Sequence, residues 1–156
     1  MSTRRQITHW EEVRSFVLAG SATFTLVSQR SGKRFTYHVT LMKPGNDGFP
    51  WWSVEIMNGP SNTDDYRFFG QLVRVGKTDV NFDDLPHTVP TGDVGALAFV
   101  WFWVRLDKHL RRGASPPPHV EFWHEGRCGR CNRKLTVPES ISSGIGPVCA
   151  TKPWGA

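Results

Sequence analysis

Residues 34–42, which read Arg-Phe-Thr-Tyr-His-Val-Thr-Leu-Met, alternate apolar and polar side chains more regularly than any other stretch of the chain. Because successive side chains of a strand point to opposite faces, the apolar residues at 35, 37, 39 and 41 would share one face. The polar residues Arg34, Thr36, His38 and Thr40 would share the other. This alternation predicts a β-strand.

Similar stretches lie on both sides of this strand. Residues 22–29, 51–57 and 66–75 are rich in Val, Thr and aromatic residues, and a short strand is expected near 80–82. Turn and loop residues separate them, for example Ser31-Gly32 and the run 44–48. Together they predict an antiparallel meander of four or five strands.

Two helices are expected beside the meander. Apolar residues at 10, 13, 16 and 17 have helical spacing, and Gly20 would end that helix. A longer helix is predicted over 94–112, with Thr91 or Asp93 as its N-cap and Gly113 as its stop. Its middle is apolar nearly all round, which predicts burial of Trp101, Phe102 and Trp103 against the sheet. The fold class is therefore α+β.

The proline run 116–118 is the best boundary in the sequence, because consecutive prolines form a stiff spacer. It divides the chain into an N-terminal α+β domain, 1–118, and a small C-terminal module, 119–156. The whole chain has 156 residues, a length typical of one domain with at most a small appendage.

Composition excludes several classes of protein. The longest apolar run, 96–104, is far below the roughly 20 residues of a membrane-spanning helix. No apolar stretch resembling a signal peptide follows the N-terminus, and three cysteines argue against a closed disulfide framework. We therefore expect a cytoplasmic protein without a membrane partner. The net charge of +5 permits a nucleic-acid partner without establishing one.

Cysteine spacing in the C-terminal module indicates a metal site. Cys128 and Cys131 form a Cys-x-x-Cys pair, and Cys149 follows eighteen residues later. Two thiolates from one tight turn can hold a single zinc ion, which needs four ligands. His124 is the best fourth ligand and His119 the second choice. The expected cofactor is one structural Zn²⁺ in a closed site of Cys128, Cys131, Cys149 and His124.

Other chemistry for the cysteines is less well supported. A redox Cys-x-x-Cys pair usually begins a helix after a strand, and that context is absent here. Free thiols without a special role stay an alternative. A catalytic zinc would keep an open position near an acid or base such as Glu121 or Glu125, but no deaminase signature accompanies it. With no other catalytic motif in the chain, we do not expect an enzyme.

Three stretches of the module carry a resemblance. They are 123–131 (WHEGRCGRC), 134–141 (KLTVPESI) and 144–149 (GIGPVC). Together they resemble a small zinc-binding module that recurs in uncharacterised phage, prophage and plasmid proteins. The resemblance covers about 30 residues. It implies metal binding and a mobile-element setting, and it carries no activity.

Two surfaces are candidates for a partner. Arg127, Arg130, Arg133 and Lys134 place four cations in eight residues beside the cysteines, a pattern that suits nucleic-acid phosphates, although such charges are often only solvated. The second surface is the polar face of the 34–42 strand with nearby aromatic residues, which are Trp51, Trp52, Tyr66, Phe68 and Phe69. Aromatic residues interleaved with basic ones can stack bases, but they more often form a core.

The leading hypothesis is a non-catalytic binding protein of phage or mobile-element type whose partner is DNA or RNA. The alternative is a protein-interaction factor that inhibits or modulates a host enzyme or defence system, with zinc purely structural.

Overall fold

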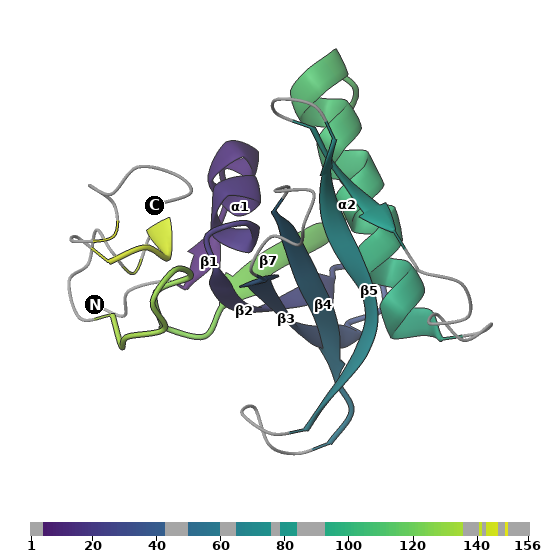
Figure 1. Cartoon of the computed structure of the whole chain (residues 1–156). Helices are drawn as coiled ribbons and strands as arrows, with labels where there is room; N and C mark the ends of the chain where they lie inside the picture. Colours follow the sequence, from purple (N-terminus) through teal and green to yellow (C-terminus); the bar gives the residue numbers. More distant parts are fainter. Residues whose placement is uncertain are drawn as a thin grey trace.

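The structure is a computed structural model that describes residues 5–42, 50–59, 65–75, 79–83, 93–135, 141, 143–146 and 149. The described residues form one antiparallel sheet and two helices (Figure 1). The elements in chain order are β1 (Gln6–Ile7), α1 (Trp10–Val17), β2 (Ser21–Ser28), β3 (Arg34–Met42), β4 (Trp51–Met57), β5 (Tyr66–Val75), β6 (Asp79–Asp83), α2 (Val94–Arg112) and β7 (Val120–His124). The strands are ordered β1-β7-β2-β3-β4-β5-β6 across the sheet.

The α+β class and the meander from β2 to β6 agree with the sequence prediction. The sheet is larger than predicted, because its seven strands include β1 and β7. Both additional strands are short, with two and five residues, so neither shows a long alternating pattern.

Strand β7 lies inside the sheet, between β1 and β2. It pairs with β2 from Ser28↔Val120 to Phe24↔His124, and with β1 at Gln6↔Trp123. The predicted boundary after residue 118 falls just before this strand. Residues on its two sides therefore share one sheet and one hydrophobic core, which includes both Phe24 and Phe122.

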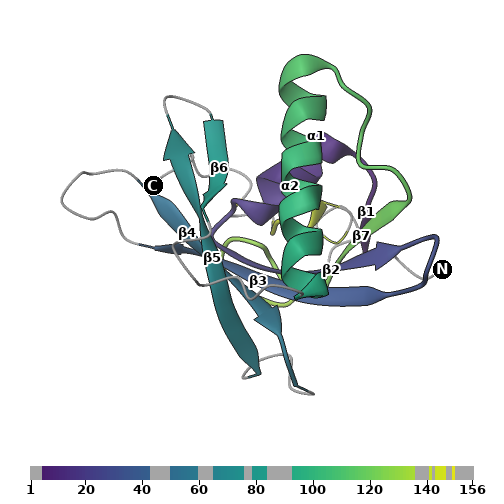
Figure 2. The ribbon, with the colours of Figure 1, turned by 90° about the vertical axis from the view of Figure 1, so that its right-hand side faces the viewer.

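One face of the sheet packs against both helices, and Figure 2 shows α2 running across it. The aromatic core of this face is continuous: Phe24 stacks on Phe122 with ring centroids 4.7 Å apart, and Tyr37 lies 5.3 Å from Phe99 of α2. The Tyr37 hydroxyl donates to the Gly95 carbonyl at 2.6 Å. Gly95 allows the close approach at this crossing, because a Cβ there would lie 2.3 Å from Ile56 Cδ1 and 2.9 Å from Phe35 Cδ1.

The ends of α2 follow the sequence prediction. Asp93 is the N-cap, and its carboxylate accepts a hydrogen bond from the Ala96 N–H at 3.0 Å and another from Arg67. Gly113 ends the helix with a φ of 69°, in the left-handed region that glycine adopts without strain.

Burial of α2 is less complete than predicted. Phe102 and Trp103 are buried, but Trp101 is 41% exposed. The helix turns Trp101 about 100° from each neighbour, so the three adjacent aromatic residues cannot all face the sheet. Neither helix in the described part of the chain is long and apolar enough to cross a membrane.

Candidate metal centre

The thiols of Cys128, Cys131 and Cys149 meet, with their three sulfur atoms all within 4.8 Å of one another. Cys128 and Cys131 lie in the turn that follows β7, and Cys149 reaches them from the far end of the segment. Cys128 and Cys149 are buried, whereas Cys131 is exposed. Thiolates bound to one zinc ion at about 2.3 Å lie about 4 Å apart, so the cluster is close to a metal-binding geometry.

The turn around Cys128 has a tight backbone conformation. Its N–H donates to the Arg133 carbonyl at 2.8 Å, and its carbonyl accepts from the Asn132 N–H at 2.9 Å. Asn132 has a φ of 66°, which asparagine tolerates better than most residues. An antiparallel bridge between Arg127 and Lys134 closes the base of the turn. We call residues 126–135 the thiol turn.

Backbone groups around Cys128 favour its thiolate form. Burial raises the pKa of this thiol, but backbone N–H groups, led by that of Gly146, more than offset it and hold the pKa below its ordinary value. The N–H groups of Gly146 and Arg130 donate to Sγ at 3.3 and 3.4 Å. Burial and the adjacent thiols raise the pKa of Cys149 to about 11. A bound cation would relieve this crowding of negative charge.

The thiol turn packs directly on α1. Gly129 and Gly144 face the Phe16 ring so closely that a Cβ would lie 2.7 and 2.5 Å from Phe16 Cδ2. The Gly129 N–H donates to the Gly144 carbonyl at 2.8 Å, and its carbonyl accepts from the Ser21 N–H at 2.6 Å. Ile145 packs against both the main core and the buried cysteines. The three-thiol cluster is therefore fixed to the sheet and to α1.

The predicted fourth ligand, His124, is not in the group of three thiols. Its Nδ1 accepts from the Gly126 N–H at 2.9 Å, and its Nε2–H donates to the Ile141 carbonyl. Pairing with Phe24 turns the imidazole toward the inner face of the sheet, where its ring lies 5.8 Å from Phe16. Burial lowers the pKa of His124, which favours the neutral ring.

The second-choice ligand, His119, lies at the opposite end of β7, where its Nε2 accepts from the Arg30 guanidinium at 3.1 Å. Among the described residues, the donors brought together are thus the three cysteines alone. Their convergence follows from the Cys-x-x-Cys spacing, whereas the position of His124 depends on the unpredicted β7.

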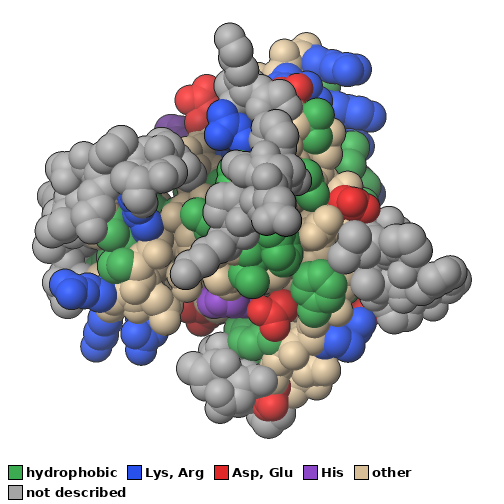
Figure 3. Space-filling model, in the orientation of Figure 1, with side chains coloured by type: hydrophobic (Ala, Val, Ile, Leu, Met, Phe, Trp, Pro, Cys, Tyr) green, Lys and Arg blue, Asp and Glu red, His purple; other side chains and the backbone are tan. Residues whose placement is uncertain are grey.

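The four predicted cations have different environments. Arg127, Arg133 and Lys134 are exposed, and the bridge places Arg127 beside Lys134. Arg130 is half-buried, and its guanidinium donates to the Cys149 carbonyl at 3.2 Å, so it closes the site from one side. In Figure 3, Lys and Arg side chains gather over the thiol turn.

The outer face of the sheet carries a polar cluster rather than a row of cations. His38 Nδ1 and Thr23 Oγ1 are 2.7 Å apart, and Thr25 donates to Glu125 at 3.2 Å. Burial, together with Glu125 and Glu55, raises the pKa of Tyr66 to about 12. These two carboxylates, which the sequence prediction did not include, make this face unfavourable for phosphate. Adjacent aromatic residues of one strand point to opposite faces of the sheet, as alternation requires. Trp52 and Phe69 are buried, whereas Phe68, the neighbour of Phe69, is 39% exposed.

Comparison with known proteins identifies the segment that carries the cysteines. Residues 120–153 match the model of DUF6011, a family of unknown function. The DUF6011 match spans 34 of the 156 residues and includes β7 and all three cysteines. No curated protein and no solved structure matches the chain. The match therefore identifies a recurring segment and carries no activity.

Proposed function

We propose that the protein holds one zinc ion through Cys128, Cys131 and Cys149, that the ion is structural, and that cations of the thiol turn bind DNA or RNA. Convergence of the three sulfur atoms carries the metal part of the proposal. Thiolates are soft ligands, and zinc is the common ion held by several of them. In keeping with the resemblance of this segment, the setting is a phage or mobile element in the cytoplasm of a bacterial host.

A structural role is favoured over a catalytic one by the surroundings of the thiols. Two of them are buried, and the site is fixed to Phe16 and Ser21 by packing and hydrogen bonds. His124 stays our candidate for the fourth ligand because it precedes Cys128 by four residues. To bind the metal, its ring would have to give up a hydrogen bond with the backbone of Gly126 or Ile141. The described residues show no general acid or base hydrogen-bonded to a cysteine.

Metal analysis of the purified protein tests the site. We expect about one zinc per chain, lost in Cys131→Ser. Cobalt substitution then identifies the ligands, because thiolate-to-cobalt absorption reports sulfur and the d–d bands respond to an imidazole. His124→Asn should change the d–d bands, whereas His109→Asn, an α2 control, should not. Full zinc content in Cys131→Ser would contradict the metal site, and unchanged bands in His124→Asn would exclude that ligand.

Nucleic-acid binding is supported by the exposed cations. Arg127, Arg133 and Lys134 form a local cluster, and within the described residues no carboxylate forms an ion pair with any of them. Basic side chains of this kind contact phosphates without reading sequence. Arg130 is better placed to hold the Cys149 carbonyl than to contact a phosphate.

Fluorescence anisotropy with labelled single-stranded and duplex oligonucleotides tests this part. The affinity should fall steeply with salt, since each phosphate contact releases a counterion. Changing Arg127, Arg133 and Lys134 to Ala should lower the salt slope by about 2 to 3. Lys108→Ala with Arg112→Ala, exposed cations of α2, is the control. Absence of binding at low salt would refute the nucleic-acid proposal and leave the metal site standing.

The second candidate function is a protein-interaction factor that modulates a host enzyme or defence system. It is favoured by exposed apolar side chains on α2, which a protein with only a nucleic-acid partner does not need. Val94, Leu97, Trp101 and Val104 are each more than 40% exposed.

A further inference from the structure

We infer that α2 and the β2–β3 hairpin form a docking groove for an acidic protein segment that inserts one large apolar side chain beside Trp101. The inference rests on the second candidate function and specifies its surface and partner chemistry. It is independent of nucleic-acid binding by the thiol turn, which follows the other end of β7.

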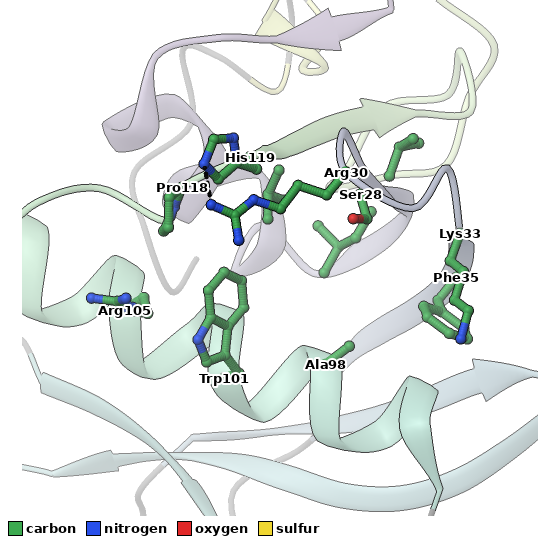
Figure 4. A pocket seen from close by; sticks show the side chains of 12 residues that line it. Ser28, Arg30, Lys33, Phe35, Ala98, Trp101, Arg105, Pro118 and His119 are labelled. Atoms are coloured by element: carbon green, nitrogen blue, oxygen red, sulfur yellow. Dashed lines mark hydrogen bonds between the residues drawn. The ribbon is translucent and has the colours of Figure 1, made fainter.

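The groove is open to solvent and has a volume of about 500 Å³. Its apolar lining comes from three separate parts of the chain: Leu26 and Phe35 in the hairpin strands, Trp101 in α2, and Pro118 and Val120 at the start of β7. In Figure 4, Trp101 points from the helix toward Arg30 and His119 on the opposite side. Binding pockets for compact ligands have about 300–1,000 Å³, so the groove accepts one large side chain with room for flanking backbone.

An apolar stripe on α2 extends the groove. Its members, Val94, Leu97, Trp101 and Val104, are spaced by three, four and three residues and so lie along one side of the helix. Their exposed fractions are 55, 50, 41 and 43%. The stripe is about 15 Å long, from ten residues at 1.5 Å each. The solvent side of a surface helix is normally polar, so this stripe indicates an interaction site.

The charges at the groove have a single sign. Arg30, Lys33 and Arg105 line it, and none of the described residues that line it carries a carboxylate. The Arg105 guanidinium lies 5.7 Å from the centre of the Trp101 ring. Within the described part of the chain, none of these three cations forms an ion pair with a carboxylate. An acidic ligand would neutralise them while its apolar group covers Trp101.

The apolar stripe and the three cations together favour a protein segment over other occupants of the groove. A small molecule would fill the groove without covering the stripe, and a nucleic acid would place phosphates against Val and Leu side chains. A twofold pairing of two copies through this surface would bring two sets of these three cations into one interface, with no described carboxylate in the groove to offset them. An acidic segment with one large apolar side chain would bury the apolar stripe and would also form ion pairs with the three cations.

A displayed library of random 12-residue peptides, selected against the whole wild-type protein, tests the inference. Enriched peptides should be rich in Asp and Glu and should share one Leu, Phe or Trp. Their Kd, measured by anisotropy on synthetic peptides, should rise at least ten-fold in Trp101→Ala and in Arg105→Glu. Both variants change exposed side chains, and circular dichroism verifies their folding. Arg112→Glu, an exposed α2 charge that is not among the lining residues, should change Kd less than two-fold.

Several results would overturn the inference. Enriched peptides without acidic bias, a selection that yields no binder, or an unchanged Kd in both groove variants would each do so. Displacement of the peptide by a 20-nucleotide single strand would assign the groove to nucleic acid instead. A concentration-dependent dimer abolished by Leu97→Asp would assign it to a second copy. Removal of Arg127, Arg133 and Lys134 should leave peptide binding intact, which separates this test from the oligonucleotide experiment.

Discussion

Phe16 is one of the residues through which the cysteine segment contacts the hydrophobic core. Its ring packs edge-to-face on Phe122, with centroids 5.7 Å apart, and it also lies against Gly129 and Gly144. Only glycine fits at these two positions. Any change that moves Phe16 is therefore expected to alter both the core and the cysteine geometry.

Gly144→Ala tests this contact. Gly144 combines a φ of 78° with a Cβ position 2.5 Å from Phe16 Cδ2, whereas Gly113 has a φ of 69° and open space around it. Gly113→Ala should lower the free energy of unfolding by about 1–2 kcal/mol, the cost of the left-handed conformation alone. Gly144→Ala should cost more and should also weaken zinc binding in a chelator-competition assay. Equal costs and unchanged zinc affinity in both variants would show that the contact with Phe16 is unimportant.

His38 should make stability depend on pH. Burial lowers the pKa of His38, so the folded protein binds this proton less readily than the unfolded chain. Its contribution is complete above the unfolded pKa of about 6.5 and decreases as pH falls below that value. Urea unfolding at pH 7.5 and 5.5 should show a smaller decrease for His38→Asn than for the wild type. His124, whose pKa is lowered as well, accounts for part of the remaining decrease.

Individual site residues were predictable to different degrees. The cysteines could be identified because a short Cys-x-x-Cys spacing constrains the backbone locally, and the third thiol had no other obvious partner. The environment of His124 could not be identified, because it depends on pairing with Phe24, a hundred residues away in the chain. The contact of Arg130 with the Cys149 carbonyl is also long-range and has no signature in the sequence.

Among the elements, α2 depends most clearly on one capping residue. Asp93 accepts a hydrogen bond from the Ala96 N–H and pairs with Arg67 of β5. Asp93→Ala should lower the free energy of unfolding by about 1–2 kcal/mol, as for other N-caps. Asp107→Ala, which removes an i,i+4 pair with Arg111 on the same helix, should cost about 0.5 kcal/mol. Chemical denaturation gives both values, and a cost for Asp107→Ala equal to that for Asp93→Ala would contradict the capping role.

Elements with a long periodic pattern were predicted well. The bounds of β3, β4, β5 and α2 agree with the sequence, because seven or more residues in each show alternation or a continuous apolar helix with caps. In contrast, β1 pairs only with β7 among the described strands, and β7 pairs with β1 and β2. These pairings join segments that are far apart in the chain, so the residues of the short strands themselves carry no pattern that predicts them.

At the scale of the whole molecule, the insertion of β7 predicts that residues 1–118 do not fold alone. Without β7, β1 loses its pairing partner and β2 has an open edge, while Phe24 and Phe16 lose Phe122. A protein truncated after residue 118 should lack a cooperative thermal transition by circular dichroism and should aggregate. A sharp transition in this fragment would instead support two separate domains with the boundary at the proline run.

The position of β7 also has a consequence for folding during synthesis. Residue 7 pairs with residue 122, so β1 can form its pairing only after more than a hundred further residues have been synthesised. Pairings between such distant segments close late and slow the folding of the chain. Until then the edge of β2 is open to other strands, which is a risk for aggregation. The thiol turn directly follows β7. Metal binding there would therefore stabilise the pairing of β7 with β1 and β2 once this strand has been synthesised.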